Sequence, residues 1–199
     1  MSSRGIYDFA DDMYKAYRNR NVEAVIVETD SGGGHSNAGD LAHEVISDRN
    51  KPVIARVLYA GSAAYNAIAG ADEIIGVKNA QFGSIGTFIT LDMKMISEYV
   101  ARFKDIYAAS SNQKNLEFRA LLEGDLGPLK AMVDQKAGAF QDTIKASRNL
   151  TGSPSTQRET LSGAMFSSKE AKDRGLADSI GNFNHLMSRT KFWMKKGKK

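Results

Sequence analysis

The pattern that most constrains the fold is an apolar, strand-like run followed by a turn and a helical segment, which recurs along the chain. The run over 22–29 leads into a glycine turn over 31–34 and then into apolar residues at helical spacing. The run over 53–58 leads through a serine-containing turn into a predicted helix over 63–71, and a third run follows at 73–77. Repeated units of this kind predict right-handed crossovers, a parallel sheet and an α/β fold.

The rest of the chain is predicted to be richer in helix. The expected elements are a helix over 7–18, a strand over 87–91, a helix over 93–103, a short strand over 105–108, an irregular polar stretch over 112–125, a long amphipathic helix over 126–149, and short helices from Ser155 and Ser167. Only a helix precedes the first strand-like run, which is unusual for a domain built on a sheet.

Composition excludes several kinds of site. The chain has 199 residues and no cysteine, so disulfides, zinc–thiolate sites and cysteine nucleophiles are ruled out. No apolar stretch has the length of a membrane span, and the first residues lack the core of a secretory signal, so we expect a cytoplasmic protein. The net charge of +4 is concentrated in a basic tail over 188–199, which we expect to be solvated, and no nucleic-acid binding is expected.

Ser62 is the first candidate for chemistry. It lies at the turn between the run over 53–58 and the next helix, where a hydroxyl is exposed beside free backbone N–H groups that favour negative charge. Nucleophilic serines are displayed in this way. The N–H groups of Ala63 and of a glycine in the 31–34 turn would then form an oxyanion hole. The alternative is an ordinary helix N-cap, a role that serine often takes.

A nucleophilic serine needs a base, and two kinds are available. Among the three histidines, His35 adjoins the glycine turn, His43 is expected to face outward from a helix, and His185 lies near the C-terminus. The other possible base is a neutral lysine, which requires desolvation or nearby positive charge. Lys114, at the start of a loop, is the candidate, and its alternative role is that of a solvated loop residue.

Several short motifs, in their order and spacing, resemble the signal peptide peptidase A family of serine proteases. The motifs are Asp30-Ser31-Gly32-Gly33-Gly34, Lys51-Pro52-Val53, Gly61-Ser62-Ala63-Ala64-Tyr65, Ala71-Asp72-Glu73-Ile74, Gly83-Ser84-Ile85-Gly86 and Ala171-Lys172-Asp173-Arg174-Gly175-Leu176-Ala177-Asp178. The phage and prophage capsid-maturation members, of the lambda protein C type, are the most similar. The resemblance implies the Clp protease/crotonase fold, a repeated β-β-α superhelix, in a single peptidase domain over 1–199 with its core at about 22–181.

Carried over by position, the resemblance implies a Ser-Lys dyad. Ser62 would be the nucleophile, Lys114 the general base, and Ser84 the residue whose hydroxyl orients the lysine amine. Gly33 and Ala63 would supply the oxyanion N–H groups. Clp proteases carry a histidine shortly after the serine, and this chain has none at that place, which favours the dyad over a triad.

The chain departs from the family pattern in three places. Gly32 replaces the usual proline, Ser110 and Ser111 replace the glycine before Lys114, and the strands that normally begin the fold are missing. These differences imply a looser turn, leave the register of Lys114 open, and imply an incomplete sheet unless a partner completes its edge.

The implied function is a serine endopeptidase that forms an acyl-enzyme without metal or cofactor. The resemblance implies a homo-oligomeric ring and a peptide or protein substrate. The apolar stripe over 126–149 is a candidate interface, and its alternative role is to pack on the chain's own sheet. A phage enzyme would process capsid or scaffold proteins in the host cytoplasm or in the virion precursor. The alternatives are degradation of leftover signal peptides, a crotonase-type acyl-CoA enzyme, and a non-catalytic assembly module.

Overall fold

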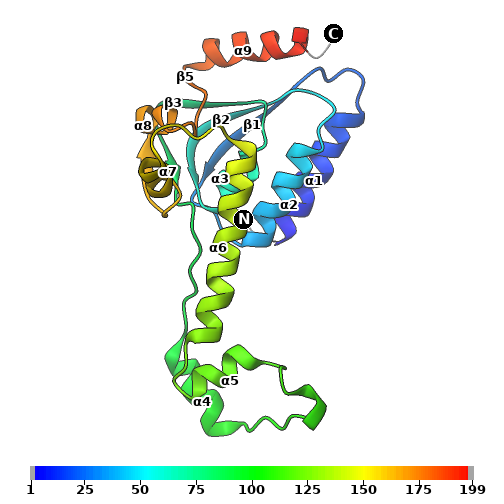
Figure 1. The fold of residues 1–199 in the computed structure, drawn as a ribbon. Coiled ribbons are helices and arrows are strands. Elements are labelled where there is room, and N and C mark those ends of the chain that lie inside the picture. The colour runs from blue at the N-terminus through cyan, green and yellow to red at the C-terminus, as the bar shows by residue number, and fades with distance from the viewer. Residues whose placement is uncertain (1–2, 197–199) are drawn as a thin grey trace. The chain divides into compact units, whose positions relative to one another are not determined.

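The structure, a computed structural model, describes residues 3–196 and groups into two compact units. The sheet unit comprises Met1–Gly86 and Phe140–Lys199, and the insert unit comprises Thr87–Ala139. Figure 1 shows the course of the chain through both. The expected single peptidase domain stays a prediction. The last three residues of the expected basic tail, 197–199, lie outside the described residues.

A five-stranded, mainly parallel sheet forms the centre of the sheet unit (Figure 1). Its strands are β1 Val25–Ser31, β2 Val53–Gly61, β3 Glu73–Gly83, β4 Met165–Ser167 and β5 Ser179–Ile180. Their order is β1-β2-β3-β4, and β5 also pairs with β3. Only β4 runs antiparallel to its neighbour, so the predicted α/β fold with a mainly parallel sheet is confirmed. Because β1, β2 and β3 are parallel, the turns that follow them meet at one edge of the sheet.

Helices pack against both faces of this sheet. The helices of this unit are α1 Ser3–Arg18, α2 Ser36–Ser47, α3 Ala63–Ile68, α7 Pro154–Thr160, α8 Ser168–Asp173, α9 Phe183–Lys196 and, from Phe140, the last part of α6 Gly127–Ser147. Figure 1 shows α1 and α2 side by side, and their apolar residues share the main core with Val53 and Ala55 of β2. On the opposite face, Leu186 of α9 packs with Ile54 and Ile75. The alternation of side chains along a strand explains why neighbours such as Val53 and Ile54 belong to different clusters.

Two aspartates of the sequence motifs, Asp72 and Asp178, accept hydrogen bonds that link the sheet to neighbouring arginines. The Asp178 carboxylate accepts hydrogen bonds from the Ile74 backbone N–H at 2.7 Å and from Arg148 Nη2 at 2.8 Å. Asp72 likewise accepts two bonds from the guanidinium of Arg49, at 2.8 and 2.9 Å. These motif residues therefore hold the fold together.

Replacement of Asp178 by alanine is expected to lower the free energy of unfolding by about 3 kcal/mol. The Arg148 side chain is only 7% exposed, so the variant would leave a buried guanidinium without its carboxylate. Chemical denaturation of the two proteins measures the difference. Asp173→Ala is the matched control, because its carboxylate joins an exposed helical pair with Lys169 and should cost less than about 1 kcal/mol. Equal losses of unfolding free energy in both variants would contradict the structural role of the Asp178–Arg148 ion pair.

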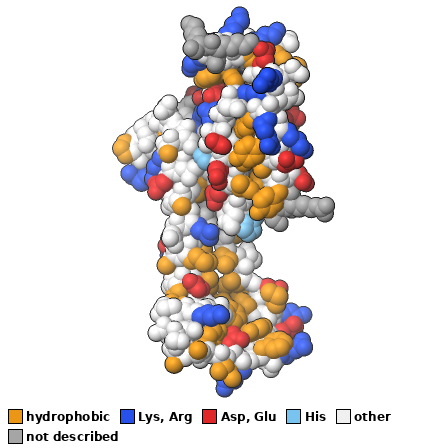
Figure 2. Space-filling view, turned by 90° about the vertical axis from the view of Figure 1, so that its right-hand side faces the viewer, with side chains coloured by type: hydrophobic (Ala, Val, Ile, Leu, Met, Phe, Trp, Pro, Cys, Tyr) orange, Lys and Arg blue, Asp and Glu red, His pale blue; other side chains and the backbone are white. Residues whose placement is uncertain are grey.

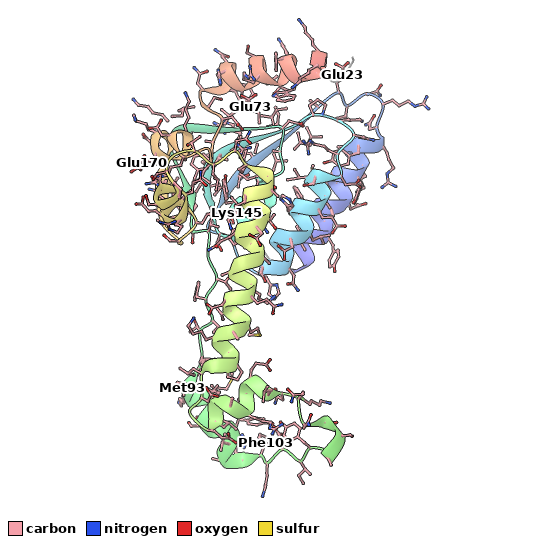
Figure 3. All side chains as sticks on the ribbon, in the orientation of Figure 1. Glu23, Glu73, Met93, Phe103, Lys145 and Glu170 are labelled. Carbon is pink, nitrogen blue, oxygen red and sulfur yellow. The ribbon has the colours of Figure 1, made fainter. Side chains whose placement is uncertain are left out.

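The insert unit exposes much of its apolar surface. It holds α4 Met93–Arg102, the 3-10 helix η1 Ala109–Ser111, α5 Leu116–Leu122 and the first part of α6 Gly127–Ser147. No residue of α4 is buried. The exposed large hydrophobic residues are Phe88, Ile89, Met93, Met95, Tyr99, Val100, Phe103, Ile106, Leu122 and Leu126. Figure 2 shows orange side chains over this unit, and Figure 3 labels Met93 and Phe103. Monomeric soluble proteins rarely expose so much apolar surface in one place.

Three local predictions in the insert unit are wrong. The segments 87–91 and 105–108 form no strand, and 112–125 contains the helix α5. Residues of high β-propensity form a strand only when another strand pairs with them, and neither segment has such a partner among the described residues. In α5, Phe118 packs edge-on against Tyr99 of α4, with ring centroids 5.7 Å apart, and this tertiary contact stabilises a helix that the polar sequence does not indicate.

The C-terminal part adds elements that the sequence did not predict. The strands β4 and β5 are three and two residues long, too short to produce a periodic pattern. The helix α9 occupies most of the expected solvated tail, because Trp193 packs with the buried cluster that includes Leu186. At the other edge of the sheet, β1 pairs only with β2 within the described residues.

Candidate active site

Gly33, Ser62 and Ser84 meet where three parallel strands end. In the sheet register, Ser31 pairs with Ala60, and Gly61 pairs with Gly83. The residues just beyond these pairs are therefore neighbours. The Ser62 backbone N–H donates to the carbonyl oxygen of Gly83 at 2.9 Å, which fixes the nucleophile candidate beside the turn that carries Ser84.

Ser62 has the backbone of a strained turn. Its φ of 51° and ψ of −127° lie in a region that residues with a side chain rarely adopt, and such strain clusters at active sites. Ser62 occupies the position before α3, but its side chain makes no capping hydrogen bond there. The hydroxyl has no hydrogen-bond partner among the residues described. The sharp turn therefore displays a half-buried, unengaged hydroxyl, as a nucleophile requires.

The residues of the two expected oxyanion donors lie beside Ser62. Gly33 has a φ of +110°, and a Cβ added to it would lie 2.9 Å from the Cβ of Ser62 and 3.0 Å from the nitrogen of Ala63. Only a glycine therefore allows the 31–34 turn to approach so closely. The Ala63 N–H donates to no acceptor in the described part of the chain. The Gly33 N–H donates to Ser31 Oγ at 3.2 Å, a bond that an oxyanion would have to replace.

Ser84 occupies a second strained turn beside the first. Its φ is 52°, and it follows Gly83, whose φ is +128°. The Ser84 N–H donates to the carbonyl oxygen of Ala164 at 2.8 Å, which anchors the turn to the residue before β4. The Ser84 side chain is half-buried and forms no hydrogen bond within the described residues. Its hydroxyl is thus available to another group.

Lys114 belongs to the insert unit, whereas the other candidates belong to the sheet unit. It is exposed, in the turn between η1 and α5, and its backbone N–H donates to Ser111 at 3.0 Å. Arg119 Nη1 donates to the carbonyl oxygen of Asn112 at 2.9 Å and so fixes the turn. The role of Lys114 as the base stays a prediction.

The histidines are engaged elsewhere or have no bond to Ser62. His35 is exposed at the N-cap of α2 and makes no capping bond. His43, expected to face outward, is half-buried, because α2 packs on α3 and Nδ1 of His43 hydrogen-bonds the carbonyl oxygen of Asn66 at 2.9 Å. His185 Nε2 lies 3.0 Å from Ser179 Oγ. No hydrogen bond links a histidine to Ser62 among the described residues.

Tyr65, a residue of the Ser62 motif whose role the sequence did not reveal, anchors the helix α3 that follows Ser62. It is fully buried, and its hydroxyl donates to the carbonyl oxygen of Leu176 at 2.9 Å. Burial raises the pKa of this hydroxyl well above its ordinary value, so it stays neutral. The ring packs edge-on against Phe82, with centroids 6.5 Å apart. The only signal in the sequence was a tyrosine among small residues three positions after Ser62, and its burial became visible only in the structure.

The comparisons with known proteins decide the family. The profile of Peptidase family S49 matches residues 46–196, which is most of the chain. The chain belongs to peptidase family S49. This S49 chain is 26% identical over 186 residues to Protease 4 of Haemophilus influenzae, and 26% identical over 178 residues to the chloroplastic serine protease SPPA of Arabidopsis thaliana. The alignments cover 88% and 85% of this chain but only 29% and 26% of those proteins.

Solved structures agree with the S49 assignment at the level of the fold. A mutant of ClpP1 from Listeria monocytogenes matches with a TM-score of 0.61 at 14% identity, over 93% of this chain and 89% of that one. A mutant of the membrane-bound stomatin-specific protease 1510-N, in complex with a substrate peptide, matches with a TM-score of 0.59 at 19% identity, over 92% and 72%. An enoyl-CoA hydratase from Mycobacterium smegmatis matches at 0.57 and 12% identity, over 95% and 65%. The predicted Clp protease/crotonase-like fold is confirmed.

The structure also bears on metals and membranes. Within residues 3–196, no three histidine, aspartate or glutamate side chains gather in a way that would hold a metal ion. No described helix has the length and apolarity needed to cross a bilayer.

Proposed function

We propose that this S49 chain is a serine endopeptidase that uses Ser62 and Lys114 as a catalytic dyad. The observation that carries the proposal is the Ser62 turn, because its strained backbone displays a hydroxyl that does not cap α3. Family membership and the names of the curated relatives support peptide-bond hydrolysis. The crotonase-like relatives support only the fold, so the acyl-CoA alternative has no comparable support.

In the proposed reaction, Ser62 Oγ attacks the peptide carbonyl carbon while its proton passes to the neutral amine of Lys114. The tetrahedral oxyanion accepts hydrogen bonds from the N–H groups of Ala63 and Gly33. The C–N bond then breaks, and Lys114 returns its proton to the leaving amine. Water attacks the carbonyl carbon of the resulting ester while one of its protons passes to Lys114. Lys114 then returns this proton to Ser62 Oγ as the C–O bond breaks and the acid product leaves.

Two local features have to adjust during this cycle. The Gly33 N–H must exchange its 3.2 Å bond to Ser31 Oγ for the oxyanion, which carries charge and is therefore the stronger acceptor. Lys114, which is exposed on the surface of the insert unit, must lose its contact with water to act as a neutral base. We infer that Ser84, with its unengaged hydroxyl, orients the lysine amine once the site is assembled.

Assembly into a homo-oligomeric ring is the proposed way to desolvate the lysine. The exposed apolar side chains of the insert unit support this proposal, because association would remove them from water. A neighbouring copy could then supply the Lys114 that acts on a given Ser62. The apolar stripe of α6, the candidate interface from the sequence, begins in the same unit, whereas its residues Phe140 and Ile144 pack in the main core of the sheet unit.

The proposed substrates are extended segments of proteins. Processing of phage capsid or scaffold proteins, in the host cytoplasm or a virion precursor, rests on the motif resemblance. Degradation of leftover signal peptides is the second candidate, and the likeness to Protease 4 and SPPA favours it. Incubation with purified capsid and scaffold proteins and with synthetic signal peptides distinguishes the two, because only the true substrate class should be cleaved efficiently.

A fluorophosphonate probe tests the proposed nucleophile directly. We expect the full-length protein to gain one probe mass on Ser62, as read by intact mass and peptide mapping, because an activated serine attacks phosphorus as it attacks a carbonyl. Ser62→Ala should gain none, and Ser36→Ala, which removes an exposed serine of α2, should still react. A protein that assembles but never forms the adduct would instead support the non-catalytic assembly module.

A further inference from the structure

The face of the sheet opposite α1 and α2 is covered by α9 toward one end of the strands. There Leu186 packs on Ile54 and Ile75, and Glu73, at the start of β3, holds the helix. Figure 3 labels Glu73 beneath α9, where its carboxylate accepts a hydrogen bond from Trp193 Nε1 at 2.7 Å. These contacts belong to the amino-terminal ends of the parallel strands. The carboxyl ends, which lead to Ser62, carry different side chains on the same face.

Asp30, Tyr59 and Gln81 form a row across those carboxyl ends, named here the polar row. The register pairs Asp30 with Tyr59, and Tyr59 with Gln81. The next residues of β2 and β3, Ala60 and Phe82, are buried in the main core, so alternation turns the polar row to the opposite face. Asp30 and Gln81 are exposed and Tyr59 is half-buried, which agrees with this orientation.

The polar row lies close to the turn that carries Ser62. A Cβ added to Gly61 would lie 3.3 Å from Tyr59 Cε1, and one added to Gly32 would lie 3.9 Å from the same atom. The tyrosine ring therefore rests against the residues that come directly before Ser62 and Gly33. At about 3.3 Å per residue, the row is roughly 10 Å from the nucleophile along the strand, the span of three residues of an extended peptide.

The chemistry of the row suits a cation. Within residues 3–196, none of its three side chains forms a hydrogen bond or ion pair. The Asp30 carboxylate attracts positive charge, the Tyr59 ring offers its negative face, and the Gln81 amide oxygen is an additional acceptor. On the same sheet, Glu28 and Arg56 form an ion pair and so neutralise each other. An anionic side chain would meet only repulsion from Asp30.

We propose that the polar row is a substrate subsite that selects a lysine or arginine side chain a few residues from the scissile bond. This inference rests on the proposed peptidase function and names a property of its substrate. A long basic side chain places its charge several ångströms from the peptide backbone, so it can reach the Asp30 carboxylate from an extended peptide that passes Ser62. A guanidinium can also stack on the Tyr59 ring.

A set of fluorogenic peptides tests the subsite. The peptides differ at one position, which carries lysine, arginine, glutamine or glutamate, and that position is moved from one to four residues away from the scissile bond. We expect kcat/KM to favour lysine and arginine over glutamine by about fivefold at one position, the scale of a partly exposed ion pair, and glutamate to be the poorest. Asp30→Asn should bring the lysine-to-glutamine ratio close to one.

The matched control is Asp8→Asn, which removes one carboxylate from an exposed position of α1. This control should keep the wild-type ratio, because α1 packs on the other side of the sheet. Three results would each overturn the proposed subsite. They are a lysine-to-glutamine ratio near one in the wild type, a ratio that Asp30→Asn leaves unchanged, and an equal fall of the ratio in both variants.

Binding to Ser62→Ala provides a second readout that does not depend on turnover. Anisotropy of labelled peptides should show the same lysine preference there, and Asp30→Asn in that background should remove it. The fluorophosphonate adduct separates the two possible failures. An adduct on Ser62 without charge preference overturns the subsite alone, whereas the absence of both adduct and cleavage overturns the peptidase function together with it.

Discussion

Replacement of Ser62 or of Lys114 by alanine is expected to lower peptide hydrolysis by about a thousandfold or more. Each change removes one half of a unit that works only as a pair: the serine is a weak nucleophile without its base, and the base has no proton to accept without the serine. The double variant should therefore be no slower than either single variant. Initial rates on a peptide substrate, normalised to folded protein, provide the measurement.

Two lysine substitutions sharpen this experiment. Lys114→Arg keeps a positive charge but cannot become neutral, so it should be as inactive as Lys114→Ala. Lys104→Ala removes another exposed lysine of the insert unit and should retain wild-type activity. Losses from the Ser62 and Lys114 variants that multiply in the double variant would show that the two residues act independently, and the dyad would then be wrong.

Replacement of Gly33 by alanine is expected to reduce kcat/KM by about a hundredfold or more and the free energy of unfolding by about 1–3 kcal/mol. The new methyl group would meet the carbonyl oxygen of Gly61 at 2.8 Å, and the φ of +110° is one that alanine avoids. The turn would have to move away from Ser62 and take its N–H with it. Steady-state kinetics and thermal unfolding measure the two effects.

Gly32→Ala is the control for this prediction. Its new methyl group would meet only Tyr59 Cε1, at the ordinary contact distance of 3.9 Å, and the Gly32 φ lies outside the left-handed region. Stability should therefore change by less than about 0.5 kcal/mol, and hydrolysis should persist. A similar loss in both variants would mean that the whole turn, rather than the approach of Gly33 to Ser62, limits activity.

The sheet unit was largely predictable because its signals are local. Apolar runs, glycine turns and helical spacing each depend on a few consecutive residues, and they located β1, β2, β3, α2 and α3. The insert unit was less predictable, because 87–91 has the residues of a strand but no strand beside it. Whether such a segment pairs depends on a partner that its own sequence does not encode.

The candidate site, too, was predictable from the sequence only in part. The position of Ser62 at a strand-to-helix turn was evident from its neighbours, but two functions of that serine, nucleophile and N-cap, remained open. The structure shows that the Ser62 hydroxyl makes no capping bond and that the backbone is strained there. The nucleophilic role of Ser62 stays a prediction. The bond from Gly33 to Ser31 was not foreseen, since a glycine turn has many conformations and only tertiary packing selects one.

The sequence alone was enough to locate the first three strands and their turns, the motifs around Ser62 and the resemblance to one peptidase family. Which residues meet became known only from the tertiary structure. The register, shifted by irregularities at 29–30 and 57–59, places Gly33 against Ser62 and aligns Asp30, Tyr59 and Gln81 beside them. Local patterns fix elements because neighbouring residues share one backbone, whereas contacts between strands depend on pairing between distant segments, which no short stretch of sequence specifies.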